Sequence, residues 1–283
     1  MFMRHSAVRI EQRRIQVGHA KIAYQVAGDG PPLVLIHGLS GSSRWWERNI
    51  LALAERFRVH VVDLIGFGAS TARHPFVLKH SPVYLAAWMD RLGIPQAHVV
   101  GHSMGGVIAA DLAADFPDRV DRLVLVDAAM FVAQQDPLAH ALGVIREFGI
   151  HQPRFLPILL GDAFQAGVGT LSRAAVELLT TDITPKLQQI QAPTLVVWGE
   201  RDAITPLDAG RRLCGALPNG RLVIVEGAGH NPMWECPSAF NRVVADFVTR
   251  PIPVTATYVT SESGAGASHA HALQPLEGAQ GAA

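Results

Sequence analysis

Short apolar runs alternate with amphipathic stretches along most of the chain. Runs such as PLVLIHG and PTLVVWG are almost continuously apolar, which is typical of strands buried on both faces of a parallel sheet. Stretches such as SPVYLAAWMDRLG and MGGVIAADLAADF repeat apolar residues with a helical period. The first runs, RIEQRRIQV and AKIAYQVAG, favour two antiparallel strands. The alternation predicts an α/β fold, with a mostly parallel, doubly wound sheet covered by helices on both faces.

Two stretches interrupt this alternation. Residues 129–185 contain the helical patterns LAHALGVIREFG, RFLPILLGDAF and SRAAVELLT without a strong strand pattern. We expect them to form a small helical cap inserted between two strands, so that residues 1–128 and 186–250 are the two parts of one core. Residues 251–283 are rich in Ala, Gly, Ser and Pro, and we expect a disordered tail because they can bury little apolar surface.

The composition limits the kinds of molecule that the protein is expected to bind. Lys and Arg together number 24, as do Asp and Glu, so the net charge of zero offers no general attraction for nucleic acid or an anionic membrane. The N-terminus lacks the apolar stretch of a signal peptide, and no run approaches the ~18 apolar residues of a membrane helix. We expect a cytoplasmic protein with a small-molecule substrate and neither a nucleic-acid nor a membrane partner; the sequence indicates no oligomeric state.

The segment VVGHSMGG contains a candidate nucleophile, Ser103. It lies in a G-x-S-x-G pentapeptide, Gly101 to Gly105, that follows an apolar strand and opens a helix, which is the setting such a serine requires. Glycines flank the serine because larger side chains would collide in a sharp turn. The adjacent His102 is a poor candidate base, since neighbouring side chains diverge, and we expect it to pack or to hydrogen bond beside the turn.

A better base and an acid follow later strands. Asp202 follows TLVVW in WGERD, and His230 follows LVIV in EGAGHNP. Because the carboxyl ends of parallel strands meet at one edge of a sheet, we expect both side chains to lie near Ser103. Asp127 also follows a strand, in LVLVDAA, and is the reserve candidate for the acid.

Over about residues 20–250 the chain resembles the α/β-hydrolase family. The resemblance implies that Ser103 is the nucleophile, His230 the general acid and base, and Asp202 the residue that orients the imidazole, in the chain order typical of that fold. It also implies that the backbone N–H groups of Leu39 and Met104 stabilise an oxyanion. The segments that carry the resemblance are HGLSGSS (37–43), DLIGFGAS (63–70), GHSMGG (101–106), WGERD (198–202) and GAGHNP (227–232).

The family implies hydrolysis through an acyl-enzyme, with no cofactor and no metal. A serine nucleophile argues against the family's epoxide hydrolases and haloalkane dehalogenases, which place an aspartate there. The expected cap is rich in Leu, Phe, Ala and Ile, so the simplest substrate is a carboxylic ester or lactone of small to medium, apolar character. Two alternatives use the same triad: C–C bond hydrolysis of ring-cleavage diketones, and cofactor-free perhydrolase or haloperoxidase chemistry. An alternative of another class is a ligand-binding, receptor-like protein.

Overall fold

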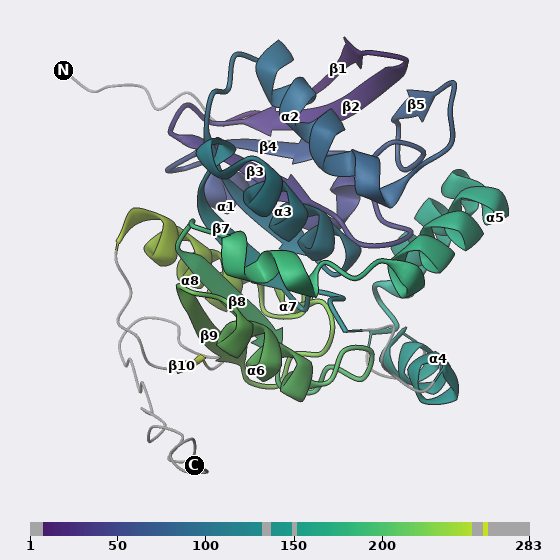
Figure 1. Cartoon of the computed structure of the whole chain (residues 1–283), viewed down its shortest axis with the longest axis vertical. Helices are drawn as coiled ribbons and strands as arrows, with labels where there is room; N and C mark the ends of the chain where they lie inside the picture. The colour runs from purple at the N-terminus through teal and green to yellow at the C-terminus, as the bar shows by residue number, and fades with distance from the viewer. Residues whose placement is uncertain (1–7, 132–136, 149–151, 251–256, 260–283) are drawn as a thin grey trace.

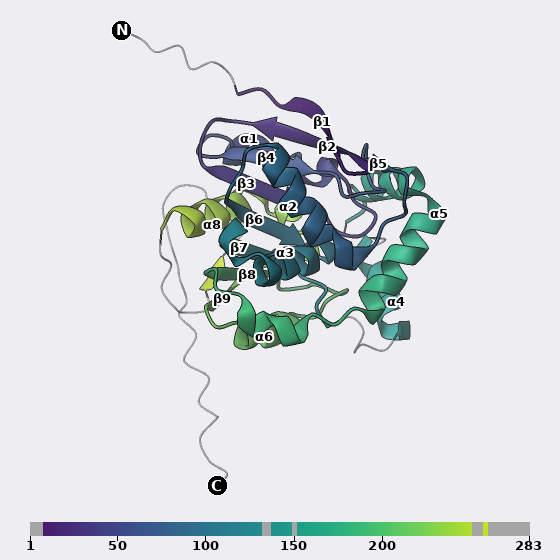
Figure 2. The same cartoon turned by 45° about the horizontal axis from the view of Figure 1, so that its top comes forward.

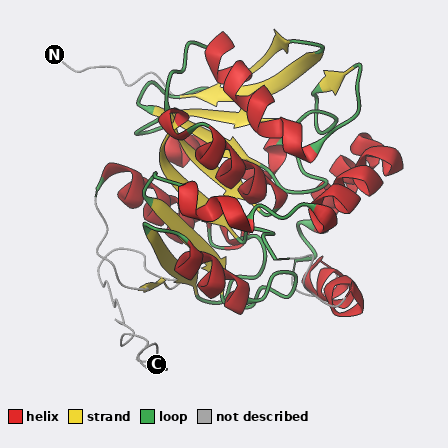
Figure 3. Cartoon of the chain, viewed as in Figure 1, coloured by secondary structure: helices red, strands yellow, loops and turns green. Residues whose placement is uncertain are grey.

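A computed structural model of the chain describes residues 8–131, 137–148, 152–250 and 257–259. Its described strands, yellow in Figure 3, form one ten-stranded sheet. The strand order is β1-β2-β4-β3-β6-β7-β8-β9-β10, with β5 paired to β2. The pairs β1–β2, β2–β4 and β2–β5 are antiparallel, and every pair from β4 to β10 is parallel. The predicted α/β fold with a mostly parallel sheet is therefore confirmed. The strands are β1 (Glu11–Val17), β2 (Ala20–Ala27), β3 (Pro32–Ile36), β4 (Arg58–Val62), β5 (Thr71–Ala72), β6 (Ala97–His102), β7 (Val120–Val126), β8 (Thr194–Gly199), β9 (Gly220–Val225) and β10 (Thr257–Val259).

Helices cover both faces of the sheet (Figure 1). Side chains alternate along a buried strand, so Val34 and Ile36 of β3 enter one apolar cluster while Leu33 and Leu35 enter the other. The first cluster includes side chains of α2 (Ser81–Arg91), α3 (Met104–Asp115) and α6 (Leu207–Ala216). The second includes side chains of α1 (Ile50–Leu53), α7 (Pro232–Glu235) and α8 (Pro237–Thr249). Burial on both faces explains why the strands have continuous apolar runs.

Two helices between β7 and β8 lie away from the sheet, α4 (Pro137–Arg146) and α5 (Leu156–Thr180), as the two views agree (Figures 1 and 2). Within α5 the helix breaks at Gly167, whose φ is 76°. We call the described residues 137–148 and 152–180 the cap segment. They fall within the predicted cap of residues 129–185, of which 132–136 and 149–151 lie outside the described residues. That the cap is a separate unit stays a prediction.

The cap segment is tied to the core by polar contacts from α5. Ser42 Oγ donates to Asp162 Oδ2 at 2.8 Å, and Gln165 Nε2 donates to the carbonyl oxygen of Gly68 at 2.6 Å. None of the helices in the described part of the chain combines the length and the apolar character that a membrane crossing requires.

The structure departs from the sequence-based expectation in two places. The stretch WWERNILALAERF forms a 3₁₀ turn (Ser43–Trp46) and the short α1 instead of one helix, and the buried Asn49 between them donates to the carbonyl of Met233. The expected disorder of residues 251–283 is wrong for Thr257–Val259, which form β10 beside β9. Their β-prone sequence TYV meets the open edge of a parallel strand there. The rest of that expected tail lies outside the described residues. Further 3₁₀ turns span Leu78–His80, Pro117–Arg119 and Thr184–Gln189.

Candidate active site

Ser103 lies in the turn between β6 and α3. Its backbone has φ 53° and ψ −117°, a conformation that costs a non-glycine residue on the order of 1–3 kcal/mol. The flanking glycines make the turn possible, because a Cβ on Gly105 would lie 2.5 Å from the carbonyl oxygen of His37, and a Cβ on Gly101 would lie 2.3 Å from that of Gly105. The surrounding fold therefore holds the serine in a strained position at the carboxyl end of a central strand.

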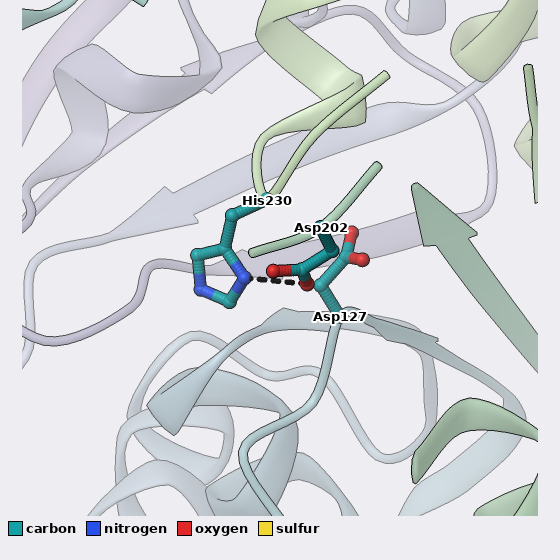
Figure 4. Close-up of side chains that lie close together, drawn as sticks. All are labelled: Asp127, Asp202 and His230. Carbon is teal, nitrogen blue, oxygen red and sulfur yellow. Dashed lines mark hydrogen bonds and ion pairs between the residues drawn. The ribbon is translucent and has the colours of Figure 1, made fainter. Parts of the chain in front are cut away.

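The structure brings together the three residues that the sequence predicts as a triad. His230 Nε2 lies 3.1 Å from Ser103 Oγ, and His230 Nδ1 lies 2.8 Å from Asp202 Oδ2 (Figure 4). The other carboxylate oxygen, Asp202 Oδ1, accepts the backbone N–H groups of Ile204 at 2.8 Å and Thr205 at 2.9 Å. With Nδ1–H donated to Asp202, the Nε2 of a neutral His230 can accept the hydroxyl proton of Ser103.

The charges around His230 suit proton transfer. Burial alone would raise the pKa of Asp202, but the neighbouring His230 and hydrogen bonds from His230 and Thr205 lower it overall. Burial alone would lower the pKa of His230, but the negative charge and hydrogen bond of Asp202 raise it overall. Asp202 is thus ionised beside an imidazole whose protonated form it stabilises, as a general base in this position requires.

Asp127, the reserve acid, lies beside Asp202 (Figure 4), but it is Asp202 that hydrogen bonds to the imidazole of His230. Asp127 Oδ1 accepts the N–H of Gly199 at 2.9 Å, and the residue is fully buried. Burial, and then the charge of Asp202, raise the pKa of Asp127 well above its ordinary value. Two carboxyl groups this close cannot both ionise easily, so Asp127 is the neutral member of the pair and Asp202 the charged one.

Asp127, Asp202 and His230 also bring one potential metal-ligand atom each within 4.8 Å of one another. However, Asp202 Oδ2 already accepts from His230 Nδ1 and from the hydroxyl of Thr205. Since the oxygen nearest the imidazole is occupied by two donors and Asp127 is neutral, the cluster is better suited to acid–base chemistry than to binding a cation.

Two neighbouring histidines hydrogen bond to backbone groups of the site. His102 Nε2 hydrogen bonds to the carbonyl oxygen of His230 at 2.8 Å, and burial lowers the pKa of His102 to about 3, so the ring is neutral and donates there. His37 donates from Nδ1 to the carbonyl of Gly38 at 2.8 Å and accepts the N–H of Leu64 at Nε2 at 3.0 Å. The packing and hydrogen bonding expected of His102 are therefore confirmed, but its partner, the carbonyl of His230, was not predicted because no spacing or motif indicates it.

The two expected oxyanion donors, Leu39 and Met104, both belong to segments close to Ser103. Met104 is the first residue of α3, so its N–H has no acceptor within the helix. Leu39 follows the loop that His37 fixes, and it lines the same cavity as Ser103. Both positions are compatible with donation to an oxygen near Ser103 Oγ.

Two further carboxylates hold the loop of His230, and sequence reasoning missed them as well. The N–H of His230 donates to Glu147 Oε1 at 2.7 Å. The N–H groups on either side, of Gly229 and Asn231, donate to Glu235 Oε1 at 3.0 and 3.2 Å. Burial, and then the charge of Glu147, raise the pKa of Glu235 to about 7. Three consecutive backbone donors therefore end on two carboxyl groups.

Known proteins resemble this chain in sequence and in structure. A family model described as "alpha/beta hydrolase fold" matches residues 31–155, and one described as "TAP-like protein" matches residues 175–257. A protein of Paraburkholderia xenovorans (strain LB400) named "2-hydroxy-6-oxononadienedioate/2-hydroxy-6-oxononatrienedioate hydrolase" is 32% identical, over 82% of this chain and 91% of its own. The chain belongs to the α/β-hydrolase family. It is an enzyme of the hydrolase class, since its relatives are named hydrolases.

Other similar proteins differ in their stated chemistry. A protein of Caulobacter sp. (strain K31) named "Putative carbamate hydrolase RutD" is 32% identical to this α/β hydrolase, over 79% of this chain and 92% of its own. The crystal structure of the enol-lactonase from Burkholderia xenovorans LB400 superposes with a TM-score of 0.71 at 25% identity, over 84% of this chain and all of that one (100%). Family membership thus fixes the fold and the class of enzyme, while the bond that is cleaved differs among the relatives.

A cavity of about 490 Å³ opens onto Ser103 and His230 of this α/β hydrolase. Leu39 and Trp45 of the core and side chains of the cap segment line it. No Asp, Glu, Lys or Arg is among the described residues that line it. The undescribed residues 132–136 and 149–151, VAQQD and GIH, contain no Lys or Arg either. The cap residues that line the cavity are Val144, Phe148, Leu159, Leu160, Ala163, Leu171, Ser172, Ala175 and Leu178.

Proposed function

We propose that this α/β hydrolase cleaves a neutral carboxylic ester or lactone with an apolar acyl group, through an acyl-enzyme on Ser103. The observation that carries the proposal is the apolar cavity, without a charged lining residue among those described, that opens directly onto the Ser103–His230 pair. Burying an unpaired substrate carboxylate in such a cavity would cost several kcal/mol. A neutral substrate avoids this cost and gains about 0.8 kcal/mol for each buried methylene.

In the proposed mechanism, His230 Nε2 removes the hydroxyl proton as Ser103 Oγ attacks the carbonyl carbon. Asp202 stabilises the imidazolium that results, and the N–H groups of Leu39 and Met104 donate to the oxyanion. The imidazolium then gives its proton to the leaving alcohol or to the ring oxygen of a lactone. A water molecule, deprotonated by His230, finally releases the acid and regenerates Ser103.

C–C bond hydrolysis is the second candidate, because several relatives are named as hydrolases of oxo-dienoates or oxo-dienedioates. Those names describe carboxylates, for which the described cavity lining offers no cationic partner. We therefore rank it below ester or lactone hydrolysis. Perhydrolase chemistry and a receptor role have no comparable observation in their favour.

Turnover of p-nitrophenyl esters of increasing acyl length, of neutral lactones and of a ring-fission dienoate tests the proposal. We expect hydrolysis of the neutral substrates, with Ser103→Ala as the matched inactive control, and labelling of Ser103 by a fluorophosphonate. The proposed ester or lactone hydrolysis would be refuted if every ester and lactone gave neither turnover nor a burst of product. Efficient turnover of the dienoate alone would establish C–C bond hydrolysis instead.

A further inference from the structure

The cap segment contributes a buried carboxylate to the loops that hold the triad. Glu147 directly follows α4 and is fully buried. Its Oε1 accepts the N–H of His230 at 2.7 Å, and its Oε2 accepts the N–H of Ala203 at 3.3 Å. Ala203 is the residue next to Asp202. One side chain from the cap segment therefore binds both the loop that carries the acid and the loop that carries the base.

The backbone in this region is built to receive that carboxylate. A Cβ on Gly229 would lie 1.9 Å from Glu147 Oε1, so only glycine leaves room for it beside His230. One helical turn before Glu147, a Cβ on Gly143 would lie 2.0 Å from the carbonyl oxygen of Ala203. The end of α4 thus packs directly against the loop of Asp202, and both contacts depend on where α4 lies.

A bridge connects Glu147 to the second carboxyl group on the same loop. Gln152, also from the cap segment, donates from Nε2 to Glu147 and, at 3.0 Å, to Glu235 Oε1. Its Oε1 accepts from Asn231 Nδ2 at 2.8 Å. Together with the contact from His102 to the His230 carbonyl at 2.8 Å, these bonds fix the backbone of His230 on both sides.

Resting on the proposed serine-hydrolase function, we propose that Glu147 is a positioning residue: a cap-derived carboxylate that sets the geometry of Asp202 and His230 and stabilises the protonated imidazole. The reactivity of Ser103 then depends on the seating of α4 against the core. A neutral amide could accept only one of the two N–H groups, and it would lack the negative charge of the carboxylate. That charge lies close to the imidazole that becomes positive in the transition state.

Several charged groups near His230 affect the pKa of its imidazole. Asp202, then Glu147 and Glu235, act to raise the pKa of His230, against the effect of its burial. Among the described residues, Asp127 and His102 are further titratable groups beside it; burial raises the pKa of Asp127 well above its ordinary value and lowers that of His102 to about 3, so both are held toward their neutral forms. Removing the charge of Glu147 should therefore lower the pKa of His230, whereas a purely structural role for Glu147 would leave it unchanged.

The test compares Glu147→Gln with a matched control, Glu177→Gln. Glu177 is also in the cap segment and also accepts a core backbone N–H, that of Leu78, but it belongs to α5 and contacts neither triad loop. Two readouts are needed that do not depend on knowing the substrate. One is the rate at which a fluorophosphonate labels Ser103 between about pH 5 and pH 9. The other is the NMR titration of His230 in protein labelled with ¹⁵N-histidine.

In E147Q we expect labelling to be slower by about tenfold, since small displacements in a catalytic constellation can cost up to about a hundredfold. We also expect the titration midpoint of His230 to move to lower pH, while E177Q keeps the wild-type midpoint and rate. Wild-type labelling and an unchanged midpoint in E147Q would overturn the proposal. So would slower labelling that follows only a loss of thermal stability, without a shift of the midpoint.

A second variant covers the case in which E147Q does not fold. Gly143→Ala keeps the carboxylate but forces α4 away from Ala203, so it should also slow the labelling; an unchanged rate would contradict the dependence on α4. If wild-type protein is not labelled at all, yet the His230 midpoint shifts in E147Q, the serine-hydrolase function fails while the electrostatic role of Glu147 stands.

Discussion

Replacing Asp127 by asparagine tests which of two adjacent buried carboxyl groups carries the charge. Asp127 accepts the N–H of Gly199 at 2.9 Å and lies beside Asp202. In D127N the amide oxygen can still accept from Gly199, and the amide nitrogen can donate toward Asp202. Because burial and the charge of Asp202 raise the pKa of Asp127 well above its ordinary value, the substitution replaces a carboxyl group that is held toward its neutral form by a neutral amide.

The size of the effect on stability follows from proton linkage. An aspartate in the unfolded chain titrates near pH 3.9, as a rough value, whereas folded Asp127 keeps its proton to higher pH. Between these two points the folded state holds a proton that the unfolded state has lost, so the free energy of unfolding falls by about 1.4 kcal/mol for each pH unit. This contribution is fully present below about pH 4 and is lost as the pH rises through the folded pKa. D127N has no such loss.

Urea unfolding of wild type and D127N between about pH 5 and pH 8 measures the difference. We expect the stability of D127N relative to wild type to increase with pH, and its ester turnover at neutral pH to fall by less than about tenfold. D202N, the matched control, should lose about 10⁴-fold in kcat. The reasoning would be refuted if the free energies of unfolding of wild type and D127N changed in parallel with pH while D127N was inactive and D202N active. Asp127 would then be the acid of the triad.

Three other predictions concern the nucleophile, the histidines and the cavity. Ser103→Gly should abolish labelling yet raise the free energy of unfolding by about 1 kcal/mol in urea titrations, because glycine tolerates φ 53° without strain; a destabilised variant would contradict this. His230→Ala should remove nearly all ester turnover, while His102→Ala, which removes a hydrogen bond to the carbonyl of His230 and ring contacts with Trp45 and His230, should lower it about tenfold; equal losses would argue against His230 as the base. Each methylene added to the acyl chain should raise kcat/KM about fourfold until the cavity is full, and a flat series of p-nitrophenyl esters would contradict an apolar acyl site.

The sequence predicts the sheet and the three residues of the candidate triad because the signals for them are local. An apolar run followed by Ser103, Asp202 or His230 places each residue at the carboxyl end of a strand, and the parallel sheet then brings the three together. The glycines around Ser103 report the sharp turn for the same reason. The short strand β10, by contrast, depends on an edge of β9 that only the assembled sheet provides.

The contacts of Glu147 and His102 could not be predicted because their partners are backbone groups far away in the sequence. Glu147 stands 83 residues from His230, and His102 stands 128 positions from the carbonyl it contacts. Every residue except proline has a backbone N–H, and every residue has a backbone carbonyl. The sequence therefore does not indicate which of these groups a distant side chain contacts. The weak signals are the glutamate at the end of a helical pattern in GVIREFG and the glycine before His230, and neither of them indicates that the two residues meet.

The contact between Glu147 and the triad loops limits how freely this enzyme can be recombined. Chimeras that exchange the cap segment of one homologue for that of another are an attractive route to new substrate selectivity, since the cap segment supplies much of the cavity lining. Here such an exchange would also remove the acceptor for the N–H groups of His230 and Ala203. A chimera that retains Gly143, Glu147 and Gln152 from this chain and replaces only α5 would change the cavity lining but keep the contacts to the loops of Asp202 and His230. The junction for such a chimera therefore lies inside the cap segment, after residue 152.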